Sequence, residues 1–448
     1  MLETSSTSVV PRWFLQYIWL SGLIYPAEHT AHRRKADTSP LQSMKFVMSP
    51  AGKVYCYIVA FVTTTLAVLT QMDYFGFYWK DIVTLDFFVL IRLINNNAVG
   101  VQVPLIFIVL IVSRRAAADF RMSLNETVPL VFSRPEIARI RKYCSMFLFI
   151  YISAILGITI AAVVQHQWTR LGFFHSVVIG YQNQSGYTGM AFALLTTPLC
   201  VNVDLASQMS GVTFIVVLAS GFDKVRRTVE EAYCAMLPDT ELSVVIQKAT
   251  ARLQKLRNLT ADFNEAFGLL VLLQCVRDLV AVISFIALLL RYNGKLMDET
   301  SEQYDARSVI QARSDRWDYI FLTITLTHSV IRISVCLYCS KAVVKIIRLL
   351  QKVEIEVNAE NVRTSCSYML SKIDPSTGTI SAGGFALINM EYVAGVFGAL
   401  VAYGVVVYQA SDSKEAAQEL AKVNTVRYET NELKEFIRHH FGNFSQMP

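Results

Sequence analysis

SAGGFALINMEYVAGVFGALVAYGVVVYQA, residues Ser381 to Ala410, is the last apolar segment of the chain. Its five glycines are Gly383, Gly384, Gly395, Gly398 and Gly404. Small residues of this kind let membrane helices approach one another closely. The segment closes with an apolar run, residues 402–408, followed by the amide of Gln409. A helix with this composition suits packing around an axis better than facing lipid.

Composition places the whole chain in the membrane class. Hydrophobic residues make up 53% of its 448 residues, charged residues only 17%, and the mean hydropathy is +0.40. Such a chain predicts an all-α membrane protein, in which lipid replaces water as the solvent for most side chains. We find no phosphate-binding loop, catalytic triad or metal-ligand spacing. We therefore expect no enzymatic activity, no cofactor, no metal and no nucleic-acid partner.

Seven apolar segments approach or exceed the roughly 20 residues that a helix needs to cross a bilayer. They are roughly Val54–Met72, Ile82–Ser113, Tyr143–His166, Met190–Ser220, Ala266–Leu290, Trp317–Ser340 and Ile388–Gln409. The second is long and is interrupted by residues 95–97 and Pro104. We expect one kinked or tilted helix there in preference to a broken one.

The direction of the chain follows from its Lys and Arg residues. With seven spans, 26 of the 41 lie on the side of the N-terminus and 12 on the other, the remaining three being inside spans. The more basic side is normally cytoplasmic. We therefore expect the N-terminus inside and the C-terminus outside, which is the reverse of a G-protein-coupled receptor.

Two stretches carry a resemblance to a known family. Ser381 to Phe385 with Leu387, then Ala402-Tyr403, five further residues and Gln409-Ala410, resemble the C-terminal signature of the insect gustatory and odorant receptor superfamily. That signature ends in Thr-Tyr, five hydrophobic residues and Gln-Phe. Residues 252–270 resemble the start of the family's fifth span. The chain departs from the signature at Ala402 and Ala410, and by the tail of residues 411–448.

The resemblance implies a chemosensory, ligand-gated, non-selective cation channel in the plasma membrane. Four copies, identical or related, would surround a pore lined by the last helix and permeable to monovalent and divalent cations. The implied pore and gate residues are Tyr403, Val406, Val407, Gln409 and Ala410. Because Ala410 replaces a bulky Phe, Val406, Val407 or Tyr408 would have to supply the apolar seal. The alternative for Gln409 is an amide that caps the helix end at the interface.

Polar stripes in the second, fourth and sixth spans are candidates for a ligand site. A charge at the centre of a bilayer costs about 2.5–3.5 kcal/mol, so charges there call for a functional explanation. The candidate residues are Arg92, Asn95, Asn96, Asp204, Gln208, Thr325, His328 and Arg332. Together with aromatic side chains they suit a small polar ligand, sugars included. The alternative is internal pairing of Arg332 with Asp204, or of Arg92 with Asp86.

Two further groups of residues have structural explanations. Arg277 and Asp278 in the fifth span are expected to pair with each other or to line an inner vestibule. Cys336 and Cys339 have the spacing of a redox or zinc motif. They lie in an apolar helix without a second ligand pair, so packed membrane thiols are the favoured interpretation.

Charged helical segments between the spans define the remaining organisation. Leu253, Leu256 and Phe263 recur on one helical face, which predicts a cytoplasmic extension packed against a partner. In the family such extensions form an anchor domain that holds four subunits together. The expected units are residues 1–53 (cytoplasmic), 54–221 (spans one to four), 222–265 (extension), 266–340 (spans five and six), 341–387 (extension, anchor domain), 388–410 (pore helix) and 411–448 (extracellular amphipathic tail).

Two other functions are compatible with seven spans. The chain would then be a receptor that signals through a cytoplasmic partner such as a G protein, or a secondary transporter that uses the intramembrane charges. The sequence shows no internal repeat of the kind that transporters contain.

Glycosylation tests the predicted direction of the chain. Asn183 and Asn443 are the sequons expected outside, and Asn125 and Asn258 those expected inside. In insect cells, removing the first pair should abolish the glycosidase-sensitive mass, whereas removing the second pair should leave it unchanged. Loss of the glycan with Asn125 and Asn258 instead would invert the topology and favour a G-protein-coupled receptor.

Overall fold

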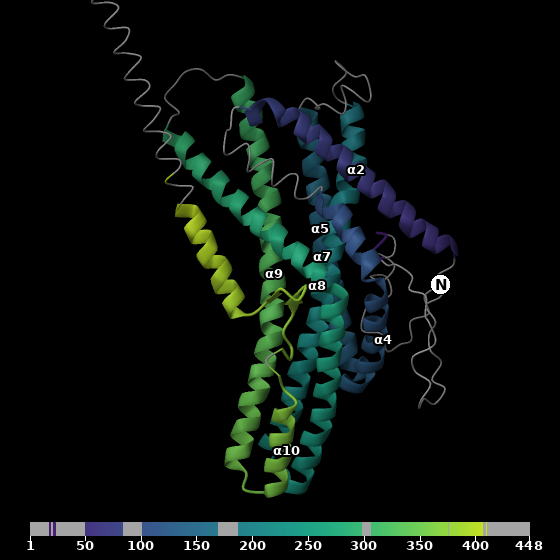
Figure 1. Ribbon diagram of the computed structural model, residues 1–448, viewed down its shortest axis with the longest axis vertical. Coiled ribbons are helices and arrows are strands. Elements are labelled where there is room, and N and C mark those ends of the chain that lie inside the picture. Colours follow the sequence, from purple (N-terminus) through teal and green to yellow (C-terminus); the bar gives the residue numbers. More distant parts are fainter. Residues whose placement is uncertain are drawn as a thin grey trace, which may run out of the picture.

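The computed structural model describes residues 18, 21–23, 50–83, 101–168, 187–297, 306–374, 376–405 and 409, and these are mostly helical (Figure 1). The numbered helices are α2 (Pro50–Val83), α4 (Arg114–Val131), α5 (Arg134–Trp168), α7 (Tyr187–Cys234), α8 (Asp239–Met297), α9 (Ala306–Glu356) and α10 (Glu360–Ser371). Two further helices are Val101–Val112 and Met390–Val405, the second of which is called the last helix below. The strands β1 (Ser381–Ala382) and β2 (Ala386–Leu387) form a small antiparallel hairpin.

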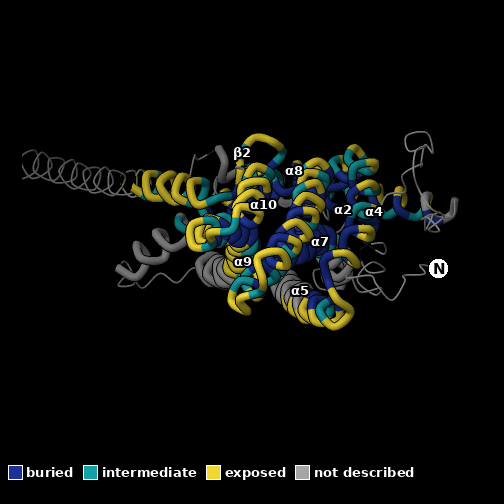
Figure 2. Tube along the Cα trace, turned by 90° about the horizontal axis from the view of Figure 1, so that it is seen from below, coloured by how far each residue is buried: buried dark blue, intermediate teal, exposed yellow. Residues whose placement is uncertain are grey.

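Helix α7 lies at the centre of the bundle. It packs against α5, α8, α9 and α2, while α10 packs against α8 and α9 at the lower end of the molecule (Figures 1 and 2). Helices α7, α8 and α9 contain 48, 59 and 51 residues. At 1.5 Å per residue each is far longer than a bilayer core of about 30 Å. Each therefore runs on without a break through the predicted boundary between a span and its extension.

Two helical stretches among the described residues are long and apolar enough to cross a membrane, Asn202–Cys234 and Asp239–Ile286. Helix Val101–Val112 and α4 together make a third candidate, bent by 67° where they meet. The bend falls at Ser113, whereas Pro104 lies within the helix and residues 95–97 lie outside the described part of the chain. Seven spans therefore remain a prediction.

An aromatic cluster joins α4, α7 and α8 below this bend. The ring of Phe120 meets those of Phe214, Phe263 and Phe267 edge to face, with centroids 5.1, 5.6 and 5.5 Å apart. Edge-to-face pairs at these distances are favourable beyond the burial of their area. Leu253 and Leu256 on the same helix as Phe263 are also buried, which confirms the apolar stripe predicted for α8.

The glycine pair before the last helix has a different role from the expected one. Gly383 and Gly384 have φ values of 62° and 80° and form the turn between β1 and β2. Glycine adopts this left-handed region without the strain that a Cβ brings. The interpretation of these two glycines as helix-packing residues was therefore wrong, and the last helix begins only at Met390.

Near the corner between α4 and α5, Glu136 forms an ion pair with Lys224 of α7. Partial burial alone would raise the pKa of Glu136, but hydrogen bonds from Lys224 and Ser133 outweigh it and lower this pKa to about 2. A carboxylate with a lowered pKa stabilises the fold above its unfolded value of about 4.5, and this contribution disappears as the pH falls through about 2.

We predict that the thermal stability of detergent-solubilised protein falls between pH 4.5 and 2, and that Glu136→Gln removes part of this dependence. Glu126→Gln, at an exposed position of α4, is the control and should keep the wild-type profile. Identical pH profiles for wild type and Glu136→Gln would contradict the assignment.

Candidate functional site

Two buried ion pairs connect α7, α8 and α9 in the upper half of the molecule. Arg277 of α8 pairs with Asp204 of α7, and Arg332 of α9 pairs with Asp278 of α8. The exposed fractions of these four side chains lie between 2% and 11%. The two guanidinium groups balance the two carboxylates, so the charges of these four residues sum to zero.

Hydrogen bonds satisfy many of the remaining polar atoms. The amide of Gln208 donates to Asp204 at 3.1 Å, and Arg332 donates to the side-chain carbonyl of Gln274 at 3.2 Å. A second nitrogen of Arg277 donates to the Thr325 hydroxyl at 3.4 Å. These residues and the two ion pairs are called the charge network below. Charges buried this deeply are stable only when they are paired and hydrogen-bonded in this way.

Beside the charge network lies a pair of stacked rings. Tyr151 of α5 and His328 of α9 are parallel to within 8°, with centroids 4.5 Å apart, and both side chains are buried. The Tyr151 hydroxyl, His328 Nδ1 and Arg332 Nε have no hydrogen-bond partner among the described residues. Buried polar atoms without a partner mark places where water or a ligand can bind.

The structure brings together five of the eight predicted ligand-site residues. Asp204, Gln208, Thr325, His328 and Arg332 are all buried in or beside the charge network. The other three, Arg92, Asn95 and Asn96, lie outside the described residues.

The buried charges pair internally, but with partners that differ from two of the expected pairs. Arg332 does not pair with Asp204, and Arg277 and Asp278 do not pair with each other. Consecutive residues on a helix point in directions about 100° apart, so Arg277 reaches α7 while Asp278 reaches α9. The expected pair of Arg92 with Asp86 lies outside the described residues.

Sequence reasoning missed Gln274 and Tyr151. Gln274, Arg277 and Asp278 are spaced i, i+3 and i+4, which places all three on one side of α8. That spacing, in a span with few other polar residues, was a usable signal. Tyr151 carried none, because a tyrosine in an apolar helix is ordinary.

In the sequence, the predicted gate residues lie at the end of the last helix and just beyond it. Tyr403 is half-buried and Gln409 is exposed, whereas Val406, Val407 and Ala410 lie outside the residues whose side chains are described. Phe397, at 68% exposed, and Val401, at 52%, leave an apolar face of this helix uncovered in the single chain. Asn183 and Asn443, the two expected glycosylation sites, also lie outside the described part.

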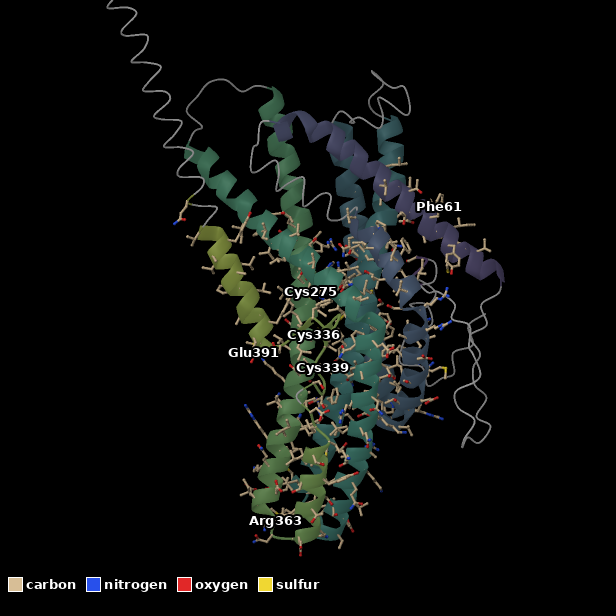
Figure 3. The ribbon with its side chains drawn as sticks, viewed as in Figure 1. Phe61, Cys275, Cys336, Cys339, Arg363 and Glu391 are labelled. Carbon is tan, nitrogen blue, oxygen red and sulfur yellow. The ribbon has the colours of Figure 1, made fainter. Side chains whose placement is uncertain are left out.

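Thiols lie close to the charge network without forming a metal site. Cys275 of α8 and Cys336 and Cys339 of α9 are buried thiols (Figure 3). The described residues hold no group of three or more His, Cys, Asp or Glu that could bind a metal ion. The packed-thiol interpretation of Cys336 and Cys339 agrees with their burial.

Removing one charge of a buried pair tests the charge network. We predict that Asp204→Leu lowers the free energy of unfolding by about 3–5 kcal/mol, because the buried guanidinium of Arg277 loses the Asp204 carboxylate. The double variant Asp204→Leu, Arg277→Met should recover most of that loss, since neither charge of this pair remains. Thermal unfolding in detergent measures both.

Lys352→Gln is the matched control, because it breaks an exposed pair with Glu356 at 3.9 Å. This substitution should lower the free energy of unfolding by less than about 1 kcal/mol. A single Asp204 variant as stable as this control, or a double variant no better than the single one, would contradict the assignment.

Comparison with known proteins identifies the fold. No family model matches the chain, and no curated protein matches its sequence. Among solved structures, the insect olfactory receptor OR5 from Machilis hrabei is similar with a TM-score of 0.55 at 12% identity, covering 89% of this chain and 98% of the receptor. The same receptor in complex with eugenol gives a TM-score of 0.49 at 13% identity, covering 91% of this chain and 100% of that one. The chain therefore has the fold of an insect olfactory receptor, in agreement with the family that its C-terminal residues resemble.

Proposed function

We propose that the protein is a chemosensory receptor of the insect chemoreceptor superfamily, acting as a ligand-gated, non-selective cation channel in the plasma membrane. The observation that carries this proposal is the likeness to an olfactory receptor over 98% of that receptor's length. The C-terminal signature, residues 381–410, supports it independently from sequence.

The exposed face of the last helix supports assembly into a tetramer. Phe397, Val401 and Val405 are more than half exposed in the single chain. In a tetramer, neighbouring copies would cover part of this apolar surface and four last helices would surround the pore. Val406, Val407, Gln409 and Ala410 would then border the gate, which closes by excluding water from an apolar constriction.

The ligand would bind beside the charge network and would itself be uncharged. The two arginines and two aspartates already neutralise one another, so a charged ligand would find no free counter-ion among them. The Tyr151 hydroxyl and His328 Nδ1, which have no hydrogen-bond partner in the described part of the chain, would instead bond a small neutral molecule with polar groups. Arg92, Asn95 and Asn96 remain proposed contacts of the same pocket, and a sugar is one candidate for the ligand.

Ionic current is the test of this function. We predict that the purified protein in planar bilayers passes both Na⁺ and Ca²⁺, and that Gln409→Ala changes the Na⁺/Ca²⁺ permeability ratio or the unstimulated current by about threefold or more. Eugenol and sucrose serve as probes of activation. Gln247→Ala, at an exposed position on the lower part of α8, is the control.

Identical currents in wild type and Gln409→Ala would exclude the pore assignment. Absence of current in wild type under all conditions would favour the alternatives, a receptor that acts through a cytoplasmic partner or a secondary transporter. Those two differ in whether the isolated protein moves a solute across the bilayer.

A further inference from the structure

The β hairpin that precedes the last helix is docked on α8. Asn264 of α8 donates from Nδ2 to the Thr379 carbonyl at 3.1 Å, and its Oδ1 accepts from the Ser381 backbone N–H at 2.9 Å. One side-chain amide thus hydrogen-bonds a backbone carbonyl and a backbone N–H on either side of Ile380. The side chain of Ile380 is fully buried. Two bonds from one amide fix both the position and the orientation of the segment.

Gly268, one turn further along α8, receives the turn of the hairpin. A Cβ at Gly268 would lie 3.1 Å from the backbone nitrogen of Gly383 and 3.3 Å from the carbonyl oxygen of Ser381. These atoms belong to the backbone and cannot rotate away, so the hairpin rests on α8 with no free space. Asn264 and Gly268 are together called the hairpin seat.

The position of the hairpin constrains the start of the last helix, because only two residues separate β2 from Met390. Ile388 is fully buried, and its N–H donates to the Ile380 carbonyl at 2.9 Å. Asn389 then caps the last helix by accepting from the Tyr392 N–H at 2.9 Å. Tyr392 also packs against the buried core, with its hydroxyl near Cys275, so the first turn of the last helix lies close to α8 at a second point.

We propose that the hairpin seat is a positioning element that sets the angle of the last helix and thereby keeps the unstimulated pore closed. This inference rests on the proposed channel function. An apolar gate excludes water only while its side chains meet closely around the axis. A helix whose base can shift no longer holds them together, and water and ions enter.

The same helix α8 also carries Gln274, Arg277 and Asp278 of the charge network, about two to three turns beyond the seat. A shift of α8 at the charge network would therefore reach the base of the last helix through the seat. The inference assigns this role to Asn264 and Gly268, which are not among the predicted gate or ligand residues.

The experiment combines unstimulated Na⁺ current in planar bilayers with backbone hydrogen exchange of residues 379–392. Asn264→Ala removes both hydrogen bonds, and Gly268→Ala keeps the Asn264 amide but pushes the hairpin away from it. Both variants should raise the unstimulated current by roughly fivefold and should speed exchange at Ser381. Asn264→Asp keeps only the acceptor, so its unstimulated current and its exchange at Ser381 should lie between those of wild type and Asn264→Ala.

Ser243→Ala is the matched control, because it removes a buried hydroxyl that contacts Ser365 at 2.9 Å between α8 and α10, far from the hairpin. Its unstimulated current should equal that of wild type, which separates positioning from general destabilisation. Gly157→Ala, at a position where a Cβ meets nothing within 4 Å, controls for the added methyl group.

Faster exchange at Ser381 with an unchanged current would overturn the positioning role, as would an equal rise in current in Ser243→Ala. Unchanged exchange in Asn264→Ala would overturn the docking itself, whatever the current. Failure of the channel function is seen separately, as a wild-type protein that passes no cation current with either probe.

Discussion

The arrangement of the upper helices depends on how four buried charges are neutralised. Arg277 and Asp278 are neighbours on α8, yet each pairs with a different helix, one through Asp204 and the other through Arg332. Any rotation or sliding of α7 or α9 against α8 would separate a pair and leave a charge unpaired in an apolar surrounding, which costs several kcal/mol. Apolar packing tolerates small shifts, whereas this pairing defines one register for all three helices.

Helix α8 connects this charge network to the rest of the molecule. Its lower part supplies Phe263 and Phe267 to the aromatic cluster with α4 and α7, and the hairpin seat on the same part of the helix receives the hairpin. Further up, Cys275 lies near Tyr392 in the first turn of the last helix. One continuous helix of 59 residues therefore contacts the extension below, the charges above and the base of the last helix. In the proposed channel, that continuity would let a ligand bound in the bundle act on the distant gate.

Much of this could be predicted from the sequence, and the exceptions have physical reasons. Helical periodicity located the buried stripe at Leu253 and Leu256, and the cost of charge in an apolar span singled out Asp204 and Arg332. The partners of those charges depend on how the helices are rotated against one another, which a single sequence does not reveal. The hairpin was missed because two-residue strands leave no periodic pattern, although a Gly-Gly pair such as Gly383-Gly384 is also a turn signal.

In the proposed channel, four copies of this fold surround a pore formed by the last helix. Single-particle imaging of the protein extracted in mild detergent tests it most directly. We predict a fourfold particle in which the helices Met390–Val405 lie nearest the symmetry axis and Phe397 is covered by a neighbouring copy. A monomeric particle, or an oligomer in which the last helix faces the detergent belt on the outside, would contradict a tetrameric pore lined by this helix.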